Sequence, residues 1–381
     1  GHNITVIAGT IHGNASSKVN EKFKGRFVTK TNQDGITVWR CYVSESYNSG
    51  IIGRLWGYFS FVISGLYAGL FKIGSNFDVV LVTSPPLFVG IIAYFTSLKI
   101  GKPFIFEVRD LWPESVIDTG LLKNKFIIKL AYWMEKVFYK KARLINVLTP
   151  AFKKALIEKK DVPHQKIIMI PNAADFDMSD ELLQDFDREE FRLKNGLADH
   201  FVITYVGAHG VANGLYQVLE TAKILKETTV LFLLIGNGIS KSKLIQQAKK
   251  EQINNVRFID PVPKSEVLKY VIASEMGASV LLKNDTFKTI YSNKTFDYMS
   301  CKVPVLMAID GVSRELVEIA DAGVFIEPEN PAHFAEKIKY YLKNRQLIKV
   351  QGENGYKYAK ENFDRNVLAN QYLIELSHIR N

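Results

Sequence analysis

Short apolar runs typical of buried strands alternate along this chain with longer segments of helical period. The runs cover residues 4–8, 36–43, 79–82, 104–107, 144–148 and 167–170 in the first half, and residues 202–206, 230–235, 256–259, 277–282, 303–307 and 323–326 in the second. Strands separated by helical segments indicate parallel sheets covered by helices. The alternation predicts an α/β fold of two doubly wound units in series, and 381 residues are enough for two cores.

The boundary between the two units is predicted near residues 171–174. A strand-like run ends there, and acidic and polar residues follow from 175 to 187 before the next helical segment. We therefore expect an N-terminal domain over residues 1–172 and a C-terminal domain over residues 173–362. Residues 363–381 have helical composition with no strand after them, which predicts a helix that packs back on either domain, the N-terminal one in our interpretation.

The net charge of +10 favours anionic partners, which include phosphate esters, an acidic membrane face and nucleic acid. No recognised nucleic-acid-binding motif is present, so we expect no nucleic-acid partner. Cys41 and Cys301 are the only cysteines in the sequence, which excludes a disulfide framework and a thiolate metal cluster. A reducing cytoplasm is the simplest compartment for such a chain.

Residues 55–71 form a run of 17 uncharged residues between Arg54 and Lys72. This length is at the lower limit for a membrane-spanning helix. Three glycines weaken the run as an isolated helix, namely Gly57, Gly65 and Gly69. A buried or membrane-surface helix is therefore predicted in preference to a span, since the aromatic residues of the run suit an interface as well as a core.

Three pairs of adjacent lysines stand at residues 140–141, 153–154 and 159–160. They can add attraction to anionic lipid. The alternative for each pair is an ordinary solvated helix face.

A helix start followed by a turn and an apolar strand occupies residues 292–306. Ser292 or Asn293 can cap the first turn, where free N–H groups and the helix dipole favour an anion. Lys294 adds a full positive charge at that end, and Asp297 can accept hydrogen bonds from ribose or sugar hydroxyls. The alternative is an ordinary capped helix before a buried strand, and these residues alone do not choose between the two.

A glycine-rich turn follows the first strand of the second unit, with glycines at Gly207, Gly210 and Gly214. Glycines between a strand and a helix let the backbone approach a pyrophosphate closely. The spacing differs from the dinucleotide G-x-G-x-x-G pattern, so a nicotinamide enzyme is weakly supported. His209 is either a cationic or neutral donor to phosphate or a turn histidine bonded to its own backbone.

Charged residues follow the predicted strand at 104–107, at the edge of the sheet where open α/β folds bind ligands. Arg109 can steady a phosphate, a carboxylate or a hydroxyl, and Asp110 or Glu114 can orient an acceptor hydroxyl. The alternative is a structural ion pair between Arg109 and Asp110. We favour a functional site because two acids, an arginine and Trp112 converge on one loop.

Several motif-defined classes are excluded. The sequence contains no HExxH, paired CxxC, P-loop or G-x-S-x-G element, which excludes the corresponding metalloprotease, zinc, NTPase and serine hydrolase motifs.

Taken together, these segments resemble the retaining family 4 glycosyltransferases of the GT-B fold. Residues 169–175, Met-Ile-Pro-Asn-Ala-Ala-Asp, are similar to the I-P-N-G-V-D segment of the family, and residues 292–299, Ser-Asn-Lys-Thr-Phe-Asp-Tyr-Met, to its P-S-K-x-x-E-Y-M donor clamp. The resemblance implies two Rossmann-like domains facing across a cleft, a UDP-sugar donor, and no cofactor or metal. It implies donor-binding roles for Gly207, His209, Gly210, Ser292, Asn293, Lys294, Thr295 and Asp297, and catalytic roles for Arg109, Asp110, Glu114 and Lys294.

A narrower resemblance is to the L-fucosamine transferases of bacterial O-antigen and capsule assembly. Their D-L-W-P-E-S motif is similar to residues 110–115, and their G-T-H-G-x-A-x-G-L motif to residues 207–215. This resemblance implies a polyprenyl-diphosphate-linked saccharide acceptor at the inner face of the bacterial cytoplasmic membrane, and a peripheral association with that face.

The chain departs from the broader family at several places. Ala208 and Asn213 replace the Arg and Lys of the usual phosphate loop, so the diphosphate must be met by backbone N–H groups, Lys294 and His209. Thr289 replaces the first acid of the E-x7-E pattern, and Arg109-Asp110 replaces the usual His-Asp. The donor sugar cannot be copied from generic members.

Relatives begin with a further strand, a Gly-rich loop and a helix ahead of the segment that is similar to residues 1–7. We therefore expect that roughly thirty residues precede Gly1, the length of one such unit, and that a chain starting at Gly1 has weak or no activity.

Two other function classes stay open. One is a GT-B-shaped UDP-sugar epimerase, which needs no acceptor. The other is a noncatalytic basic protein that binds a membrane surface.

Overall fold

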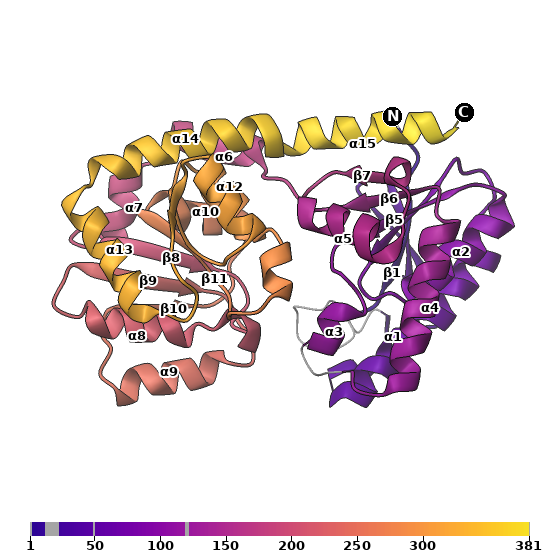
Figure 1. Cartoon of the computed structure of the whole chain (residues 1–381), viewed down its shortest axis with the longest axis horizontal. Coiled ribbons are helices and arrows are strands. Elements are labelled where there is room, and N and C mark those ends of the chain that lie inside the picture. The colour runs from indigo at the N-terminus through magenta and orange to yellow at the C-terminus, as the bar shows by residue number, and fades with distance from the viewer. Residues whose placement is uncertain (1, 12–22, 49, 119–121, 381) are drawn as a thin grey trace. The chain divides into compact units, whose positions relative to one another are not determined.

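The computed structural model describes residues 2–11, 23–48, 50–118 and 122–380 (Figure 1). The chain divides into two compact units. Unit 1 consists of Gly1–Leu148, Phe152–Met169 and Leu373–Asn381, and unit 2 consists of Thr149–Ala151 and Ile170–Tyr372.

Unit 1 contains a three-stranded sheet in the order β1-β3-β2, with bounds Thr5–Gly9 for β1, Val28–Gln33 for β2 and Ile36–Cys41 for β3. Strands β1 and β3 are parallel, whereas β2 is antiparallel to β3. Strand β2 was not predicted because its residues are mostly polar. The available signal was Asp34-Gly35, since both residues have positive φ and that dipeptide favours a tight hairpin.

A second sheet of unit 1 is fully parallel, in the order β4-β5-β6-β7. Its strands are β4 (Val80–Ser84), β5 (Phe104–Val108), β6 (Leu144–Val147) and β7 (Ile167–Met169), and all four were predicted. The helices of this part are α2 (Val89–Ile100), α3 (Glu114–Asp118), α4 (Lys125–Lys141) and α5 (Pro150–Lys160). Phe104, Ile105, Phe106 and Ile145 are fully buried and form the core beneath them.

The uncharged run at 55–71 forms helix α1 (Gly50–Tyr67) and a turn of π-helix, η3 (Ala68–Lys72). Two of its glycines are packing positions, because a Cβ on Gly65 would lie 2.6 Å from Ile92 and one on Gly69 would lie 2.2 Å from Thr96, both on α2. The close approach of α1 to α2 therefore requires them. In the part of the chain that the structure describes, no helix is both long and apolar enough to cross a membrane.

Unit 2 is built on one six-stranded parallel sheet in the order β10-β9-β8-β11-β12-β13. Its strands are β8 (Phe201–Val206), β9 (Val230–Ile235), β10 (Val256–Ile259), β11 (Met276–Val280), β12 (Val305–Ala308) and β13 (Gly323–Phe325), at the six predicted places. Strand β9 is buried along its whole length, as a parallel strand covered on both faces should be. The strand order reverses between β8 and β11, which is where doubly wound sheets bind ligands.

The helices of unit 2 cover both faces of this sheet (Figure 1). They are α6 (Phe176–Asp185), α7 (Arg188–Lys194), α8 (Tyr216–Ile224), α9 (Lys241–Lys250), α10 (Lys264–Ile272), α11 (Asn293–Ser300), α12 (Val312–Ile319), α13 (Pro331–Lys343) and α14 (Gln346–Phe363), with α15 (Arg365–Arg380) following, and the short 3-10 turns η5 (Val211–Asn213) and η6 (Thr286–Thr289). The acidic stretch at 175–187, predicted to precede a helix, is itself helix α6. Asp175 caps α6 through the Met178 amide, and Asp187 caps α7 through the Glu190 amide.

Candidate functional site

The predicted glycine turn of unit 2 is joined to a second turn that the sequence analysis did not name. Gly207 follows β8, and its amide donates to the Ile235 carbonyl at the end of β9. Gly236 follows β9 with φ +147°, and a Cβ there would lie 1.9 Å from the Gly207 carbonyl oxygen. The two turns thus touch backbone to backbone, and only glycine fits at Gly236. The signal was Gly236-x-Gly238 directly after an apolar strand.

His209 is enclosed between these two turns. Its amide donates to the Asn237 carbonyl at 2.8 Å, and its own carbonyl accepts from the Ser240 amide at 2.9 Å. The imidazole is fully buried, and neither ring nitrogen has a hydrogen-bond partner among the described residues. Burial, with the positive charge of Lys241 next, lowers the pKa of His209 to about 4.

The ring of His209 is therefore neutral at pH 7 without a bound phosphate, and the cationic donor role stays a prediction, because a phosphate beside the ring would favour its charged form. The alternative of a ring bonded to its own backbone is not what the structure shows. A neutral donor role toward phosphate stays a prediction. Gly210, one residue on, donates its amide to the Asn213 side chain at 3.3 Å, which shapes the 3-10 turn η5.

Lys294 brings the two predicted segments of unit 2 together. Its Cε lies 3.3 Å from the position that a Cβ on Gly207 would take, so the lysine stem crosses the backbone of the glycine turn. The Lys294 Nζ lies 3.4 Å from the Ser292 Oγ and 5.0 Å from the centre of the Tyr205 ring. Burial lowers the pKa of Lys294 to about 8, although the negative Asp297 opposes the shift. A phosphate placed here would favour the charged form.

The start of α11 differs from the predicted cap. Ser292 occupies the N-cap position but makes no side-chain capping bond. Its hydroxyl accepts from the Ser279 hydroxyl at 2.6 Å, and its amide donates to the Ser313 hydroxyl at 3.1 Å. The start of the helix is thus held by β11 and α12, and the Ser292 side chain does not cap its first-turn amides. Such amides are the usual donors to an anion.

The other predicted residues of α11 lie around the same turn. The Asn293 side-chain oxygen accepts from the Asn172 side-chain amide at 2.7 Å, which ties the predicted 169–175 segment to this helix start. The Thr295 hydroxyl is buried and has no partner among the described residues.

Asp297 lies one turn further along α11 and is held in an ion pair. Its carboxylate is 3.1 Å from the Nζ of Lys264, at the start of α10. Burial raises the pKa of Asp297, and Lys264 opposes that shift. Lys264 was not predicted as a partner of Asp297 from the sequence. The predicted contact of Asp297 with ribose stays a prediction.

In unit 1, the predicted loop lies at the carboxyl end of β5. The Arg109 amide donates to the Ser84 carbonyl, and the Arg109 guanidinium is 3.6 Å from the Glu107 carboxylate. The ion pair of Arg109 is thus with Glu107, where the sequence analysis had considered Asp110. Burial raises the pKa of Asp110, and a hydrogen bond from Ser115 opposes the shift.

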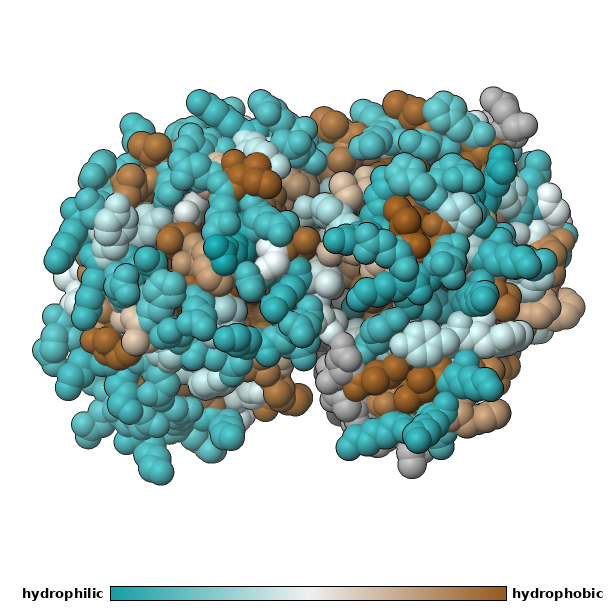
Figure 2. Space-filling model, in the orientation of Figure 1, coloured by the Kyte–Doolittle hydropathy of each residue, from teal (hydrophilic) through white to brown (hydrophobic). Residues whose placement is uncertain are grey.

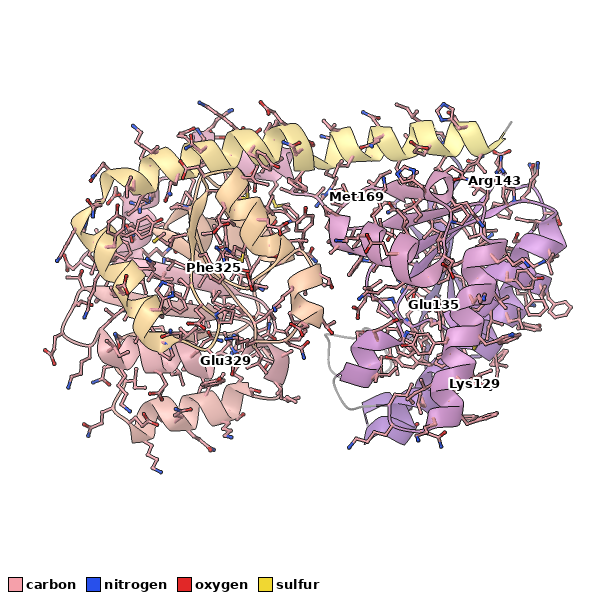
Figure 3. All side chains as sticks on the ribbon, in the orientation of Figure 1. Lys129, Glu135, Arg143, Met169, Phe325 and Glu329 are labelled. Atoms are coloured by element: carbon pink, nitrogen blue, oxygen red, sulfur yellow. The ribbon has the colours of Figure 1, made fainter. Side chains whose placement is uncertain are left out.

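Glu114, the first residue of α3, belongs to a buried ionic cluster with Lys160 and Glu135. The Lys160 Nζ lies 2.6 Å from Glu114 and 2.7 Å from Glu135, which Figure 3 labels on α4. The Lys160 and Glu135 side chains are only 9% and 4% exposed. The interpretation of Lys160 as a lipid-attracting surface residue is therefore wrong, because its charge is already used inside unit 1.

This cluster holds two carboxylates for one lysine. Burial raises the pKa of Glu135 to about 7, while Lys160 opposes the shift. Glu135 consequently gains and loses its proton near neutral pH, directly beside the acid predicted to orient an acceptor. Neither Lys160 nor Glu135 carried a sequence signal, since only the fold brings α3, α4 and α5 together.

No set of three His, Cys, Asp or Glu side chains in the described part of the chain is arranged to hold a metal ion.

Two family profiles together account for most of the sequence. Residues 1–173 match the glycosyl transferase 4-like domain, and residues 187–358 match the glycosyl transferases group 1. The chain is a glycosyltransferase with a glycosyl transferase 4-like domain followed by a group 1 domain. Each profile covers most of one half of the sequence, so the two halves of this glycosyltransferase correspond to the two domains of the family.

Individual relatives of this glycosyltransferase are distant. It is 20% identical to the putative colanic acid biosynthesis glycosyl transferase WcaI of Escherichia coli (strain K12), over 91% of this chain and 85% of WcaI. It is 23% identical to the capsular polysaccharide biosynthesis glycosyltransferase CapM of Staphylococcus aureus, over 74% of this chain and 71% of CapM.

Among solved structures, the glycosyltransferase is similar to Alr3699/HepE of Anabaena in complex with UDP. The TM-score is 0.70 at 16% identity, over 98% of this chain and 100% of HepE. This likeness establishes the fold, which is GT-B with two Rossmann-like domains.

Proposed function

We propose that this glycosyltransferase moves a hexosamine-type sugar from a UDP-sugar to a polyprenyl-diphosphate-linked acceptor, with retention at the anomeric carbon and without a metal. N-acetyl-L-fucosamine is the candidate sugar, from the motifs at residues 110–115 and 207–215. The proposed place is surface polysaccharide assembly at the inner face of the bacterial cytoplasmic membrane.

The observation that carries the proposal is the position of Lys294. Its stem crosses Gly207 at the carboxyl end of β8, and it stands in the first turn of α11, beside the point where the strand order reverses. A diphosphate is bound well by a cation together with backbone amides. A lysine, a glycine turn and a helix start at this edge of the sheet offer both. The solved complex of HepE with UDP supports a uridine nucleotide as the carrier of that diphosphate.

Electrostatic stabilisation of the departing diphosphate is the main contribution of the protein to the reaction we propose. The bond between the anomeric carbon and the UDP oxygen breaks, and its electron pair leaves on the phosphate. The acceptor hydroxyl oxygen forms the new bond on the same face of the sugar, and its proton passes to the departing phosphate. Lys294 and the amides of the first α11 turn meet the charge that develops on the leaving group.

The acceptor side of the proposal rests on unit 1. Arg109, Asp110 and Glu114 lie at or just beyond the carboxyl end of β5, where ligands bind to open α/β sheets. We propose that Asp110 or Glu114 orients the acceptor hydroxyl. The names of WcaI and CapM support a polysaccharide as the product to which the acceptor belongs.

A screen of UDP-sugars with a lipid-linked acceptor, read by mass spectrometry, tests the proposal. We expect one sugar residue to be added to the acceptor, with the α or β configuration of the donor kept. A changed UDP-sugar in the absence of acceptor would instead identify an epimerase. Absence of UDP binding together with steeply salt-dependent binding to an anionic surface would identify a noncatalytic binding protein.

A further inference from the structure

Helix α4 of unit 1 presents an apolar stripe to solvent. Phe126, Leu130 and Trp133 are 76%, 42% and 61% exposed, and the half-buried Val137 continues the line. Their spacing of four, three and four residues places them on one face of the helix. The stripe is about 17 Å long at the rise of an α-helix. Exposed aromatic side chains in a continuous line mark an interaction surface.

A second stripe on the same helix consists of exposed lysines. They lie on the flank of the apolar stripe at Lys125, Lys129, Lys136 and Lys140. Lys129 is labelled in Figure 3, and Figure 2 shows apolar residues among hydrophilic ones over this part of unit 1. The single carboxylate of α4 is Glu135, which is buried against Lys160. The exposed face of α4 is thus apolar and positive, without an exposed acid to offset the charge.

The helices next to α4 have the same character. Helix α2 contacts both α1 and α4, and a Cβ on Gly90 of α2 would lie 2.6 Å from the Phe138 ring of α4, so the two helices pack closely. Phe95 and Leu98 on α2 are exposed, and neither α1 nor α2 contains an acidic residue. Arg54 is the one charged residue of α1, which has no lysine stripe of its own, and this makes α4 the better candidate for electrostatic docking.

We propose that the outer face of α4 docks on an anionic lipid surface, with Phe126, Leu130 and Trp133 entering the boundary between headgroups and acyl chains and the lysines contacting lipid phosphates. The chemistry matches an interfacial amphipathic helix, which combines aromatic and aliphatic residues on one side with lysines beside them. A soluble protein partner would not require a row of lysines that lacks acids between them. This docking face rests on the membrane partner of the proposed function. Vesicle binding measures it without any sugar transfer.

The experiment is co-sedimentation of the full chain with vesicles of phosphatidylcholine alone and with 30% phosphatidylglycerol. The test variant is K129Q/K136Q/K140Q. The matched control is K243Q/K249Q/K250Q, which removes the same charge from exposed lysines of α9 in unit 2. Each lysine near an anionic surface contributes about fivefold to binding. We therefore expect the α4 variant to lose about a hundredfold in affinity for the mixed vesicles, and the α9 control to stay close to wild type.

Equal loss in both variants would overturn the proposal, because it would show attraction by net charge and not by this face. Binding to phosphatidylcholine alone with the same affinity would overturn the anionic requirement.

A second measurement places the helix in the lipid. Quenching of tryptophan fluorescence by brominated lipid should fall strongly in W133F, which keeps an apolar ring and should still sediment with vesicles. If W56F on α1 loses the quenching and W133F keeps it, the docking face is α1 and the proposal for α4 is refuted. A change of oligomeric state in F126S/W133S without any change in vesicle binding would identify the face as a contact between copies of the chain. Failure of UDP binding would refute the proposed function and leave the vesicle results unaffected.

Discussion

Replacement of Lys160 by methionine removes the single cation of the buried cluster in unit 1. Methionine keeps an unbranched apolar stem without the ammonium group and leaves Glu135 buried without a positive partner at 2.7 Å. Loss of one partner from a buried ion pair costs about 3 to 5 kcal/mol, because the remaining charge is uncompensated. Glu135 in the variant can escape that cost by binding a proton, so at pH 8, one unit above its pKa of about 7, we expect the pH-dependent loss in the free energy of unfolding of unit 1 to be about 1.4 kcal/mol.

The cost should depend on pH in a defined direction. The pKa of Glu135 is about 7 in the folded protein, against an ordinary value of 4.5. An acid whose pKa is raised on folding binds its proton more tightly in the folded state. Its contribution to the stability of the protein is therefore present below pH 4.5 and is lost as pH rises through 7. At pH 5.5 Glu135 is protonated with or without Lys160. The variant should then lose only the pair with the partly exposed Glu114, about 1 kcal/mol.

Urea unfolding followed by tryptophan fluorescence measures this energy in unit 1 alone. All four tryptophans, Trp39, Trp56, Trp112 and Trp133, lie in unit 1, so the signal does not report on unit 2. The control is K159M, which changes the exposed neighbour of Lys160 and should leave the midpoint within error. A second variant, E135Q, should flatten the pH dependence of the midpoint between pH 5 and 8.

Two results would refute the reasoning. One is an equal loss of stability in K160M at pH 5.5 and pH 8, which would mean that Glu135 does not titrate near neutrality. The other is an equal loss in K159M, which would mean that burial of the Lys160 charge is not the cause.

Three further predictions concern unit 2. K294A should reduce turnover far more than it reduces stability, whereas K226A, at an exposed lysine, should change neither. Unchanged turnover in K294A would remove Lys294 from the mechanism. UDP affinity, measured by calorimetry, should fall as pH rises through about 8, because the free protein then loses the Lys294 proton, and K294M should abolish this dependence; an unchanged pH profile in K294M would contradict the assignment. G236A should abolish UDP binding, since a Cβ would meet the Gly207 carbonyl at 1.9 Å, and a binding isotherm equal to wild type would show that the two turns are not part of the site.

The sequence predicted strands well where burial and periodicity agree. Residues 230–235 are apolar without interruption, and a fully buried parallel strand needs that composition. Strand β2, at the edge of a small sheet, failed the same test because Val28 is its one apolar residue. The stretch at 175–187 was misjudged for a related reason, since Asp175 and Asp187 are helix caps and a cap looks like a loop in sequence.

The candidate site of unit 2 was partly accessible from sequence. Gly207 and Lys294 each stand beside a strand end, and the structure brings them within contact. Lys264 and Gly236 were not identified, because their partners are distant in sequence.

The amino-acid sequence by itself determined the α/β fold of two units, since period and burial are written into local residue patterns. It also determined the family, through short motifs whose residues are adjacent in the chain. Only the tertiary structure decided which charges are available. Lys160 and Lys129 are both lysines in basic helices, yet one is buried between two carboxylates and the other faces solvent. That difference depends on the burial and the partner that the fold gives each ammonium group, and neither is encoded by nearby residues.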